Sequence, residues 1–266
     1  MTGQAAKGAP AVTPSPVPPS VTEDRLMGGR VRLLQPAKGY RAGMDAALLA
    51  AGCDARAGER VLDVGCGPGA VLLQAAARRP DARFWGLERD DEAARLARRG
   101  AELNGVVDRV EIMAGDVAAG FAALKLRPFD AVLSNPPFFD DAGAIRGPHP
   151  ARRGAYLADE GLAAWIGFLA KAAREGGSIT LIHRADRLSD ILAALSAKCG
   201  SVRIRPIHPF ADAPAKRVLV RAIKTGKAPL ELLPPLILHD RSGGKHTAEA
   251  EAVLRGAAAL GWDQPA

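Results

Sequence analysis

The sequence predicts an α/β protein with a doubly wound, mostly parallel sheet of seven strands, one of them antiparallel. From residue 60 onward, apolar runs with strand character alternate with segments of helical character, and this alternation is typical of parallel sheets. Only a short loop joins the last two apolar runs, which favours an antiparallel pair because a parallel connection needs a longer crossover. The 48% hydrophobic content of the 266 residues is sufficient for a sizeable core.

The predicted elements follow in chain order. Residues 1–23 are rich in Ala and Pro and predict a disordered leader, after which 24–266 form one domain. Within it, 24–56 predict a hairpin and a helix that Asp45 could cap. Residues 57–225 form the core sheet, and 226–266 a largely extended C-terminal segment. The strands are expected at 60–65, 82–88, 109–116, 129–135, 177–184, 201–210 and 216–224, and the helices at 70–79, 90–105, shortly after 116, 159–174, 187–198 and 248–259.

Charge and composition limit the class of protein. There are 36 Lys and Arg against 29 Asp and Glu, a net charge of +7, which favours a polyanionic partner; a solvated basic surface is the alternative. The three cysteines are far apart and form neither a disulfide framework nor a metal-ligand pattern, so no metal is expected and a cytoplasmic location fits best. No apolar run reaches the ~18–20 residues of a membrane span.

A glycine-rich turn follows the first predicted core strand, in the stretch VLDVGCGPGAVLL. A nucleoside triphosphate site would need a Lys-Ser/Thr pair after the glycines, which is missing. A dinucleotide remains open, since Gly65-x-Gly67-x-x-Ala70 fits that fingerprint and Glu88 is suitably spaced to hold a ribose. Asp63 argues against it, because a carboxylate there would repel a pyrophosphate. S-adenosylmethionine carries an ammonium and a sulfonium and no phosphate, so an acid at this strand end suits it.

Acidic residues end three successive predicted strands: Asp63, Glu88 and Asp116. Each acid alone is better explained as a helix N-cap or a solvated loop residue. Together they lie at one edge of the predicted sheet, where open α/β sheets bind ligands. The combination therefore favours a ligand site over three unrelated caps.

The pattern of glycines and acids, together with the stretch Asn135-Pro136-Pro137-Phe138, resembles the Rossmann-like class I methyltransferases that act on planar nitrogens. The resemblance implies S-adenosylmethionine as cofactor, with the first acid near its methionine part, the second on ribose and the third near adenine. It implies cofactor contacts at Asp63, Gly65, Cys66, Gly67, Gly69, Glu88, Arg89, Gly115, Asp116, Val117 and Asn135, with Gln35 and Asp45 in the preceding segment.

The flanks of the core carry a narrower resemblance. The stretches LLQPAKGYRAGMDAALLAA and LILHDRSGGKHTAEAEAVLR are similar to those of bacterial tRNA adenine-N6 methyltransferases that modify position 37 of a valine tRNA. This implies an RNA substrate. Enzymes that methylate glutamine amides in release factors or guanine N2 use related motifs, so these acceptors stay open. Candidate RNA contacts, for which solvated loops are the alternative, are Tyr40, Arg41, Arg146, His149, Arg152 and Arg153.

The Asn-Pro-Pro-Phe stretch has a chemical interpretation. An exocyclic aromatic amine is a poor nucleophile, and two acceptors on its hydrogens would aim its lone pair at the methyl group. Asn135 Oδ1 and the Pro136 carbonyl are the predicted acceptors, and Pro136 and Pro137 restrict the backbone. Phe138 is predicted to stack on the target base, worth ~1–3 kcal/mol. The structural alternative is a rigid strand-to-loop turn.

Overall fold

The computed structural model describes residues 20–38, 41–137, 161–241 and 245–262. Its main sheet is built from β3 (Arg60–Val64), β4 (Arg83–Glu88), β5 (Val110–Ala114), β6 (Phe129–Ser134), β7 (Ala173–Arg184), β8 (Cys199–His208), β9 (Arg217–Lys224), β10 (Glu231–Leu232) and β11 (Leu236–Ile237).

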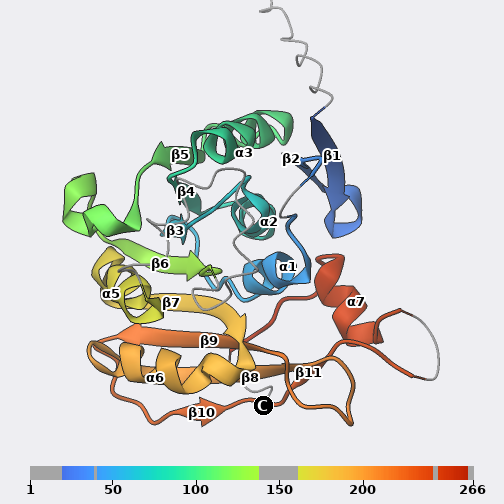
Figure 1. The fold of residues 1–266 in the computed structure, drawn as a ribbon, viewed down its shortest axis with the longest axis vertical. Coiled ribbons are helices and arrows are strands. Elements are labelled where there is room, and N and C mark those ends of the chain that lie inside the picture. The colour runs from blue at the N-terminus through green and yellow to red at the C-terminus, as the bar shows by residue number, and fades with distance from the viewer. Residues whose placement is uncertain (1–19, 39–40, 138–160, 242–244, 263–266) are drawn as a thin grey trace, which may run out of the picture.

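The strand order is β10-β8-β9-β7-β6-β3-β4-β5, and β11 also pairs with β8. Figure 1 shows the strands stacked in this order, from β5 near the top to β8 and β10 near the bottom. β9 pairs antiparallel with β7 and β8, and the other pairs of this sheet are parallel. The predicted fold class, with one antiparallel strand, is confirmed. The two additional strands, β10 and β11, contain two residues each and come from the segment predicted to be extended.

Helices cover both faces of the sheet and define two hydrophobic cores. One core contains residues of α1 (Met44–Ala51), α2 (Ala70–Arg78), α3 (Asp91–Leu103) and α7 (Ala248–Leu254). The other contains residues of α5 (Leu162–Ala172), α6 (Leu188–Ser196) and the short helix η3 (Phe121–Leu124). Successive side chains of a strand point to opposite faces, so Val61 of β3 lies in the first core and Leu62 in the second. The shorter 3₁₀ helices are η1 (Met27–Gly29), η2 (Val117–Ala119) and η5 (Ala185–Arg187).

A separate two-stranded sheet precedes the core. Its strands, β1 (Val21–Leu26) and β2 (Val31–Pro36), pair antiparallel as the predicted hairpin. Asn104, at the end of α3, fastens this hairpin to the core: its Oδ1 accepts the Arg32 N–H at 2.9 Å and its Nδ2 donates to the Arg32 carbonyl at 2.7 Å. The hairpin therefore has a fixed position beside the helices that follow β3 and β4.

Three local predictions need correction. β1 begins at Val21, so residues 21–23 belong to the hairpin and not to a leader. Asp45 does not cap α1: the N-cap is Gly43, and the Asp45 carboxylate lies 2.8 Å from Nε of Arg217 on β9. α7 ends at Leu254, earlier than predicted, because Gly256 takes a φ of 73° that ends helical geometry. Within the described residues, no helix is long and apolar enough to cross a membrane.

Candidate active site

The carboxyl ends of β3, β4, β5 and β6 meet at one edge of the sheet. Val64 pairs with Leu87 on one side and with Ser134 on the other, and Glu88 pairs with Ala114. The residues that follow these strands are therefore neighbours at this edge. The parallel register brings together the glycine turn, Glu88, Asp116 and the Asn-Pro-Pro stretch, as predicted from the order of elements.

The glycine turn between β3 and α2 has the conformation that glycine permits. Gly65, Gly67 and Gly69 have φ values of 72°, 54° and 92°, which side chains with a Cβ rarely adopt. A Cβ at Gly65 would lie 3.0 Å from the Trp165 ring, so this glycine is also required by close packing. A Cβ at Gly67 would meet no atom within 4 Å among the described residues. Among the described residues, the space beside Gly67 is therefore open.

The backbone donors of this turn are already used by the protein. The N–H groups of Gly65 and Cys66 both donate to the Leu87 carbonyl, at 2.9 and 3.1 Å, and that of Gly69 donates to the Cys66 carbonyl at 2.9 Å. The Gly67 N–H donates to Glu88 Oε2 at 2.9 Å, and residue 68 is a proline without an N–H. A pyrophosphate is normally held by vacant N–H groups of such a turn. The geometry of residues 65–69, all within the described chain, thus disfavours the dinucleotide alternative.

Asp63 is a buried carboxylate, 1% exposed, near the end of β3. Its Oδ2 has no hydrogen-bond partner among the described residues. Burial, with the nearby Glu88 carboxylate acting in the same direction, raises the pKa of Asp63 to about 8, although the Leu72 N–H opposes the rise. A buried carboxylate of this kind is stabilised in its charged form by a cation. The orphaned oxygen therefore fits the positively charged methionine part of S-adenosylmethionine.

The other two acids differ from Asp63 in their surroundings. Glu88 accepts three backbone N–H groups, from Gly67, Arg89 and Asp90, at 2.8–2.9 Å. A carboxylate has about four lone-pair positions, so one remains for a ribose hydroxyl. Asp116 caps η2 through the Ala118 N–H at 2.9 Å and lies 3.3 Å from Nη1 of Arg89. Both acids are partly buried, and their roles toward ribose and adenine remain predictions.

Smaller features of this edge complete the predicted cofactor set. Gly115 follows β5, and a Cβ there would lie 2.7 Å from a methyl group of Leu87, so a larger residue would require that side chain to shift. Val117 begins η2 and is partly buried. Burial raises the pKa of the Cys66 thiol well above its usual value, so this side chain is an inert part of the turn.

Asn135, Pro136 and Pro137 follow β6, and Asn135 is partly buried beside the glycine turn. Two residues that the sequence analysis did not single out hold this end of β6 in place. The buried Ser134 hydroxyl donates to the Val64 carbonyl at 2.9 Å, and Trp165 Nε1 donates to the Ser134 hydroxyl at 2.9 Å. In the sequence, the available signal for Ser134 was a serine directly after the apolar residues 131–133 of this strand. Trp165 lies on α5, and its contact is tertiary.

The predicted residues of the N-terminal segment are engaged with the protein. Gln35 is buried; its Nε2 donates to Asp24 and its Oε1 accepts the Ala42 N–H at 2.7 Å. Arg41 pairs with the same Asp24 carboxylate and donates to the Thr22 hydroxyl at 2.8 Å. Asp45 is paired with Arg217. In the described part of the chain, no hydrogen bond joins Gln35, Arg41 or Asp45 to the three acids of the predicted cofactor site. Predicted site residues that lie outside the described part of the chain are Tyr40, Phe138, Arg146, His149, Arg152 and Arg153.

Replacing Glu88 with Gln is expected to weaken S-adenosylmethionine binding and to destabilise the protein by about 1–3 kcal/mol. The amide keeps one acceptor oxygen, so either the Gly67 N–H or the Arg89 and Asp90 N–H groups lose their partner. Calorimetric titration and thermal unfolding measure the two effects. The matched control is Glu92→Gln, the same change at an exposed position of the first turn of α3. Equal cofactor affinity in both variants would contradict the role of Glu88.

The known proteins to which this chain is similar are methyltransferases. Residues 41–146 match the Methyltransferase small domain family. The chain is 32% identical over 214 residues to the tRNA1(Val) (adenine(37)-N6)-methyltransferase of Porphyromonas gingivalis, covering 76% of this chain and 83% of the relative. It is 31% identical over 167 residues to the release factor glutamine methyltransferase of Chlorobaculum tepidum, covering 59% of this chain but only 56% of the relative.

Solved structures give the same fold. A protein described as a predicted O-methyltransferase from Agrobacterium tumefaciens superposes with a TM-score of 0.68 at 31% identity, covering 81% of this chain and 98% of that one. A 16S rRNA N2 G1207 methyltransferase from T. thermophilus, solved with AdoMet and guanosine, superposes with a TM-score of 0.55 at 21% identity, covering 79% of this chain and 52% of that one. The second likeness supports the fold alone.

The nine-stranded sheet and the acids around its glycine turn define a class I S-adenosylmethionine-dependent methyltransferase. Within that class, the chain belongs to the Methyltransferase small domain family, and S-adenosylmethionine is its cofactor.

Proposed function

We propose that this protein transfers a methyl group to the exocyclic N6 of adenine in RNA, and that its target is adenosine 37 of a tRNA anticodon loop. The observation that carries the proposal is the position of Asn135, Pro136 and Pro137 directly beside the glycine turn. An amide oxygen and a proline carbonyl at this place are suited to a planar NH2 group, because each accepts one of its hydrogens.

The proposed chemistry depends mainly on positioning. S-adenosylmethionine, when bound, supplies a methyl group already activated by its sulfonium. Asn135 Oδ1 and the Pro136 carbonyl hold the amine so that its lone pair points toward that methyl group. The N–C bond forms as the S–C bond breaks, and the nitrogen then releases a proton to water. No residue has to act as a titrating base before transfer.

Two observations support RNA as the acceptor. The Porphyromonas gingivalis tRNA methyltransferase is matched over 83% of its length, so the similarity extends beyond the cofactor half of the sheet. The net charge of +7 suits a polyanionic substrate. The target base must leave its stack to reach Asn135, and an anticodon loop allows this at low energetic cost.

A glutamine amide of a protein is the second candidate. It is supported by the Chlorobaculum tepidum release factor methyltransferase, whose identity to this chain is similar. The same two acceptors at Asn135 and Pro136 would hold a side-chain amide equally well. This relative is matched over only 56% of its length, which makes it the weaker guide to the acceptor.

The decisive experiment supplies labelled S-adenosylmethionine to the full chain with total tRNA and, separately, with a bacterial protein extract. The expected result is label in tRNA, recovered as N6-methyladenosine after digestion to nucleosides and mapped to position 37. Label in N2-methylguanosine, or in methylglutamine from the protein arm, would overturn the proposed acceptor while leaving the methyltransferase class intact.

A further inference from the structure

A hollow lies at the same edge of the sheet as the acids and Asn135. Its volume is about 440 Å³, within the range of roughly 300–1,000 Å³ of ligand pockets. It is formed between the β8–β9 connection and the segment after β11. β8 ends beside the first residue of β9, which itself pairs with the last residue of β7, so all three ends share this edge. The lining residues are Phe210, Ala211, Asp212, Ile237, His239, Asp240, Arg241 and Thr247.

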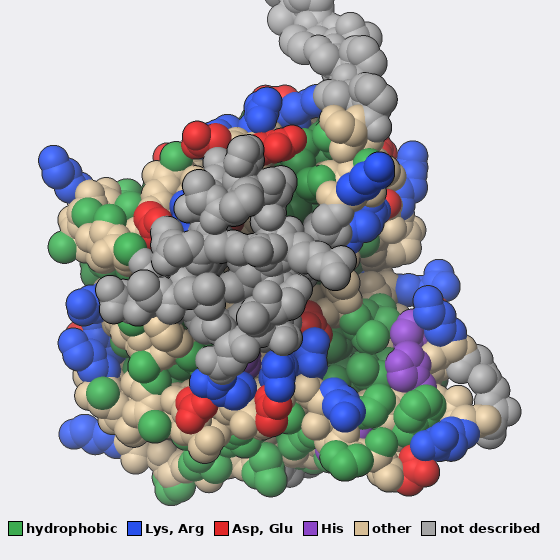
Figure 2. Space-filling model, in the orientation of Figure 1, with side chains coloured by type: hydrophobic (Ala, Val, Ile, Leu, Met, Phe, Trp, Pro, Cys, Tyr) green, Lys and Arg blue, Asp and Glu red, His purple; other side chains and the backbone are tan. Residues whose placement is uncertain are grey.

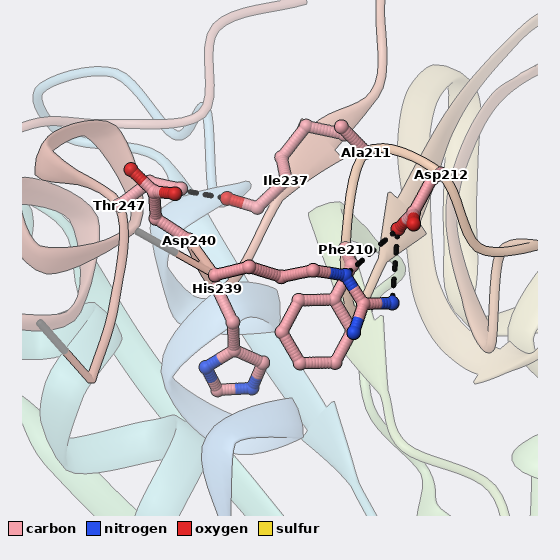
Figure 3. A pocket seen from close by; sticks show the side chains of 8 residues that line it. Phe210, Ala211, Asp212, Ile237, His239, Asp240 and Thr247 are labelled. Atoms are coloured by element: carbon pink, nitrogen blue, oxygen red, sulfur yellow. Dashed lines mark hydrogen bonds and ion pairs between the residues drawn. The ribbon is translucent and has the colours of Figure 1, made fainter. Parts of the chain in front are cut away.

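Aromatic rings from two segments meet in this hollow. Figure 3 shows Phe210, from the β8–β9 connection, beside His239, from the segment after β11; their ring centroids are 5.5 Å apart. His239 also stacks on His246, with centroids 5.1 Å apart. The Arg241 guanidinium lies over the Phe210 ring, 4.3 Å from its centroid, and is held there by Asp212 at 3.1 Å. Partly exposed aromatic rings next to an arginine are typical of sites that bind unpaired bases.

The rings are not the sole contact between the two described segments. The two segments are already joined by backbone hydrogen bonds, from the Leu238 N–H to the His208 carbonyl and from the His239 N–H to the Pro209 carbonyl, both 2.9 Å. The Thr247 hydroxyl closes the second segment by donating to the Ile237 carbonyl at 2.7 Å. Phe210 and His239 nevertheless remain partly exposed. Their exposed surface is therefore available to a ligand.

The charges around the hollow distinguish a base from a phosphate. Asp212 and Asp240 line it together with Arg241, which pairs with Asp212, so carboxylates outnumber cations in the lining and a phosphate group is not favoured there. Further cations lie between the hollow and Asn135, where β7 ends with Arg184, which pairs with Asp186, and the exposed Lys216 precedes β9. Figure 2 shows Lys and Arg side chains gathered on this face, with histidines bordering a hydrophobic patch. A base in the hollow and phosphates on the cations match this distribution.

We propose that the hollow binds one unpaired nucleobase of the RNA substrate, a few nucleotides from the adenosine that is methylated. The ends of β6 and β8 are three strand positions apart, roughly 14 Å at about 4.8 Å per strand, which a short single-stranded segment spans. The inference rests on the proposed RNA substrate and adds a second contact that selects single-stranded sequence beside the target.

The test measures binding of a labelled anticodon stem-loop RNA to the full chain by fluorescence anisotropy. Phe210→Leu keeps an apolar side chain but removes the stacking face, and should weaken RNA affinity by about 5- to 150-fold. S-adenosylmethionine affinity should stay at the wild-type value. Phe210→Tyr retains the ring and should bind RNA nearly as well as the wild type.

Trp85→Leu is the matched control. Trp85 is also a partly exposed ring covered by an arginine, with the Arg60 guanidinium 4.8 Å from its centroid, but it lies within β4. RNA binding should not change in this variant.

Equal RNA affinity in Phe210→Leu and wild type, with N6-methyladenosine still produced, would overturn the proposal that the hollow binds a base and would leave the proposed function standing. Loss of RNA binding in Phe210→Leu, with the label found only in protein glutamine, would show that the hollow contacts RNA but would overturn the proposed acceptor, and with it the position of the bound base beside a methylated adenosine. Absence of RNA binding by the wild type overturns both.

Discussion

Replacing Asn135 with Ala is expected to reduce kcat by about 10²–10³-fold, the effect of removing one oriented hydrogen bond from a transition state. S-adenosylmethionine affinity should fall far less than kcat, because the main predicted role of Asn135 is to hold the acceptor amine, whereas Asp63, Glu88 and Asp116 carry most of the predicted cofactor contacts. The measurements are single-turnover methylation of tRNA and calorimetric titration of the cofactor. Asn135→Asp keeps an acceptor oxygen and should retain more activity than the alanine variant.

Asn104→Ala is the control for loss of structure. Asn104 also uses its whole amide, on the Arg32 backbone and on the Gly100 carbonyl at 2.7 Å, but its contacts fasten the β1–β2 hairpin. This variant should unfold at a lower temperature and keep the wild-type kcat at temperatures where it is folded. A wild-type methylation rate in Asn135→Ala would show that the Asn-Pro-Pro stretch is only a rigid turn.

Replacing Asp63 with Asn is expected to weaken S-adenosylmethionine binding by about 1–3 kcal/mol and to stabilise the cofactor-free protein at alkaline pH. The raised pKa of Asp63, to about 8 from 3.8, means that the folded protein binds this proton more tightly than the unfolded chain. Its contribution to stability is fully present below pH 4 and is lost as pH rises toward 8. The Asn variant has no carboxyl group at this position and does not lose this stability. The free energy of unfolding of the variant, relative to that of the wild type, should therefore increase between pH 5 and pH 8.

Chemical unfolding of the cofactor-free proteins across this pH range measures the stability effect. Cofactor affinity of the wild type should rise toward pH 8, because a bound cation favours the ionised carboxylate. Calorimetry at pH 7 in buffers of different ionisation enthalpy should detect proton release on binding. The cofactor's own amino group also titrates near this pH, and it contributes equally to proton release in the wild type and in the Asn variant. The difference in proton release between the two proteins is therefore due to Asp63. Identical pH profiles would contradict the assignment.

The sequence predicted the edge of the sheet well because parallel strands impose a shared geometry. Once Asp63, Glu88 and Asp116 were assigned to the ends of successive strands, their proximity followed from register. The single antiparallel strand was predictable for a similar reason, since the connection to β9 is too short for a crossover.

Tertiary contacts set the limit of sequence-based prediction. Nothing in the local sequence indicates that Trp165 reaches Ser134, or that Arg217 draws the Asp45 carboxylate away from a capping position. The two-residue strands β10 and β11 carry no alternating pattern and exist because β8 offers them an edge. The hollow combines Phe210 with His239, two residues on separate segments that no motif links.

The reversed direction of β9 places the β8–β9 connection at the same edge of the sheet as the acids, but on the opposite side of β6. The β3, β4 and β5 half carries the acids and the glycine turn, and its connections are constrained by one cofactor. Because β9 starts at the edge where β7 and β8 end, the β8–β9 loop opens onto the acceptor side without crossing the cofactor half. If the hollow beside that loop binds the RNA substrate as proposed above, insertions or substitutions in the loop would alter which molecule is methylated while the methyl donor stays the same. Related enzymes with different acceptors are the expected result of such an arrangement.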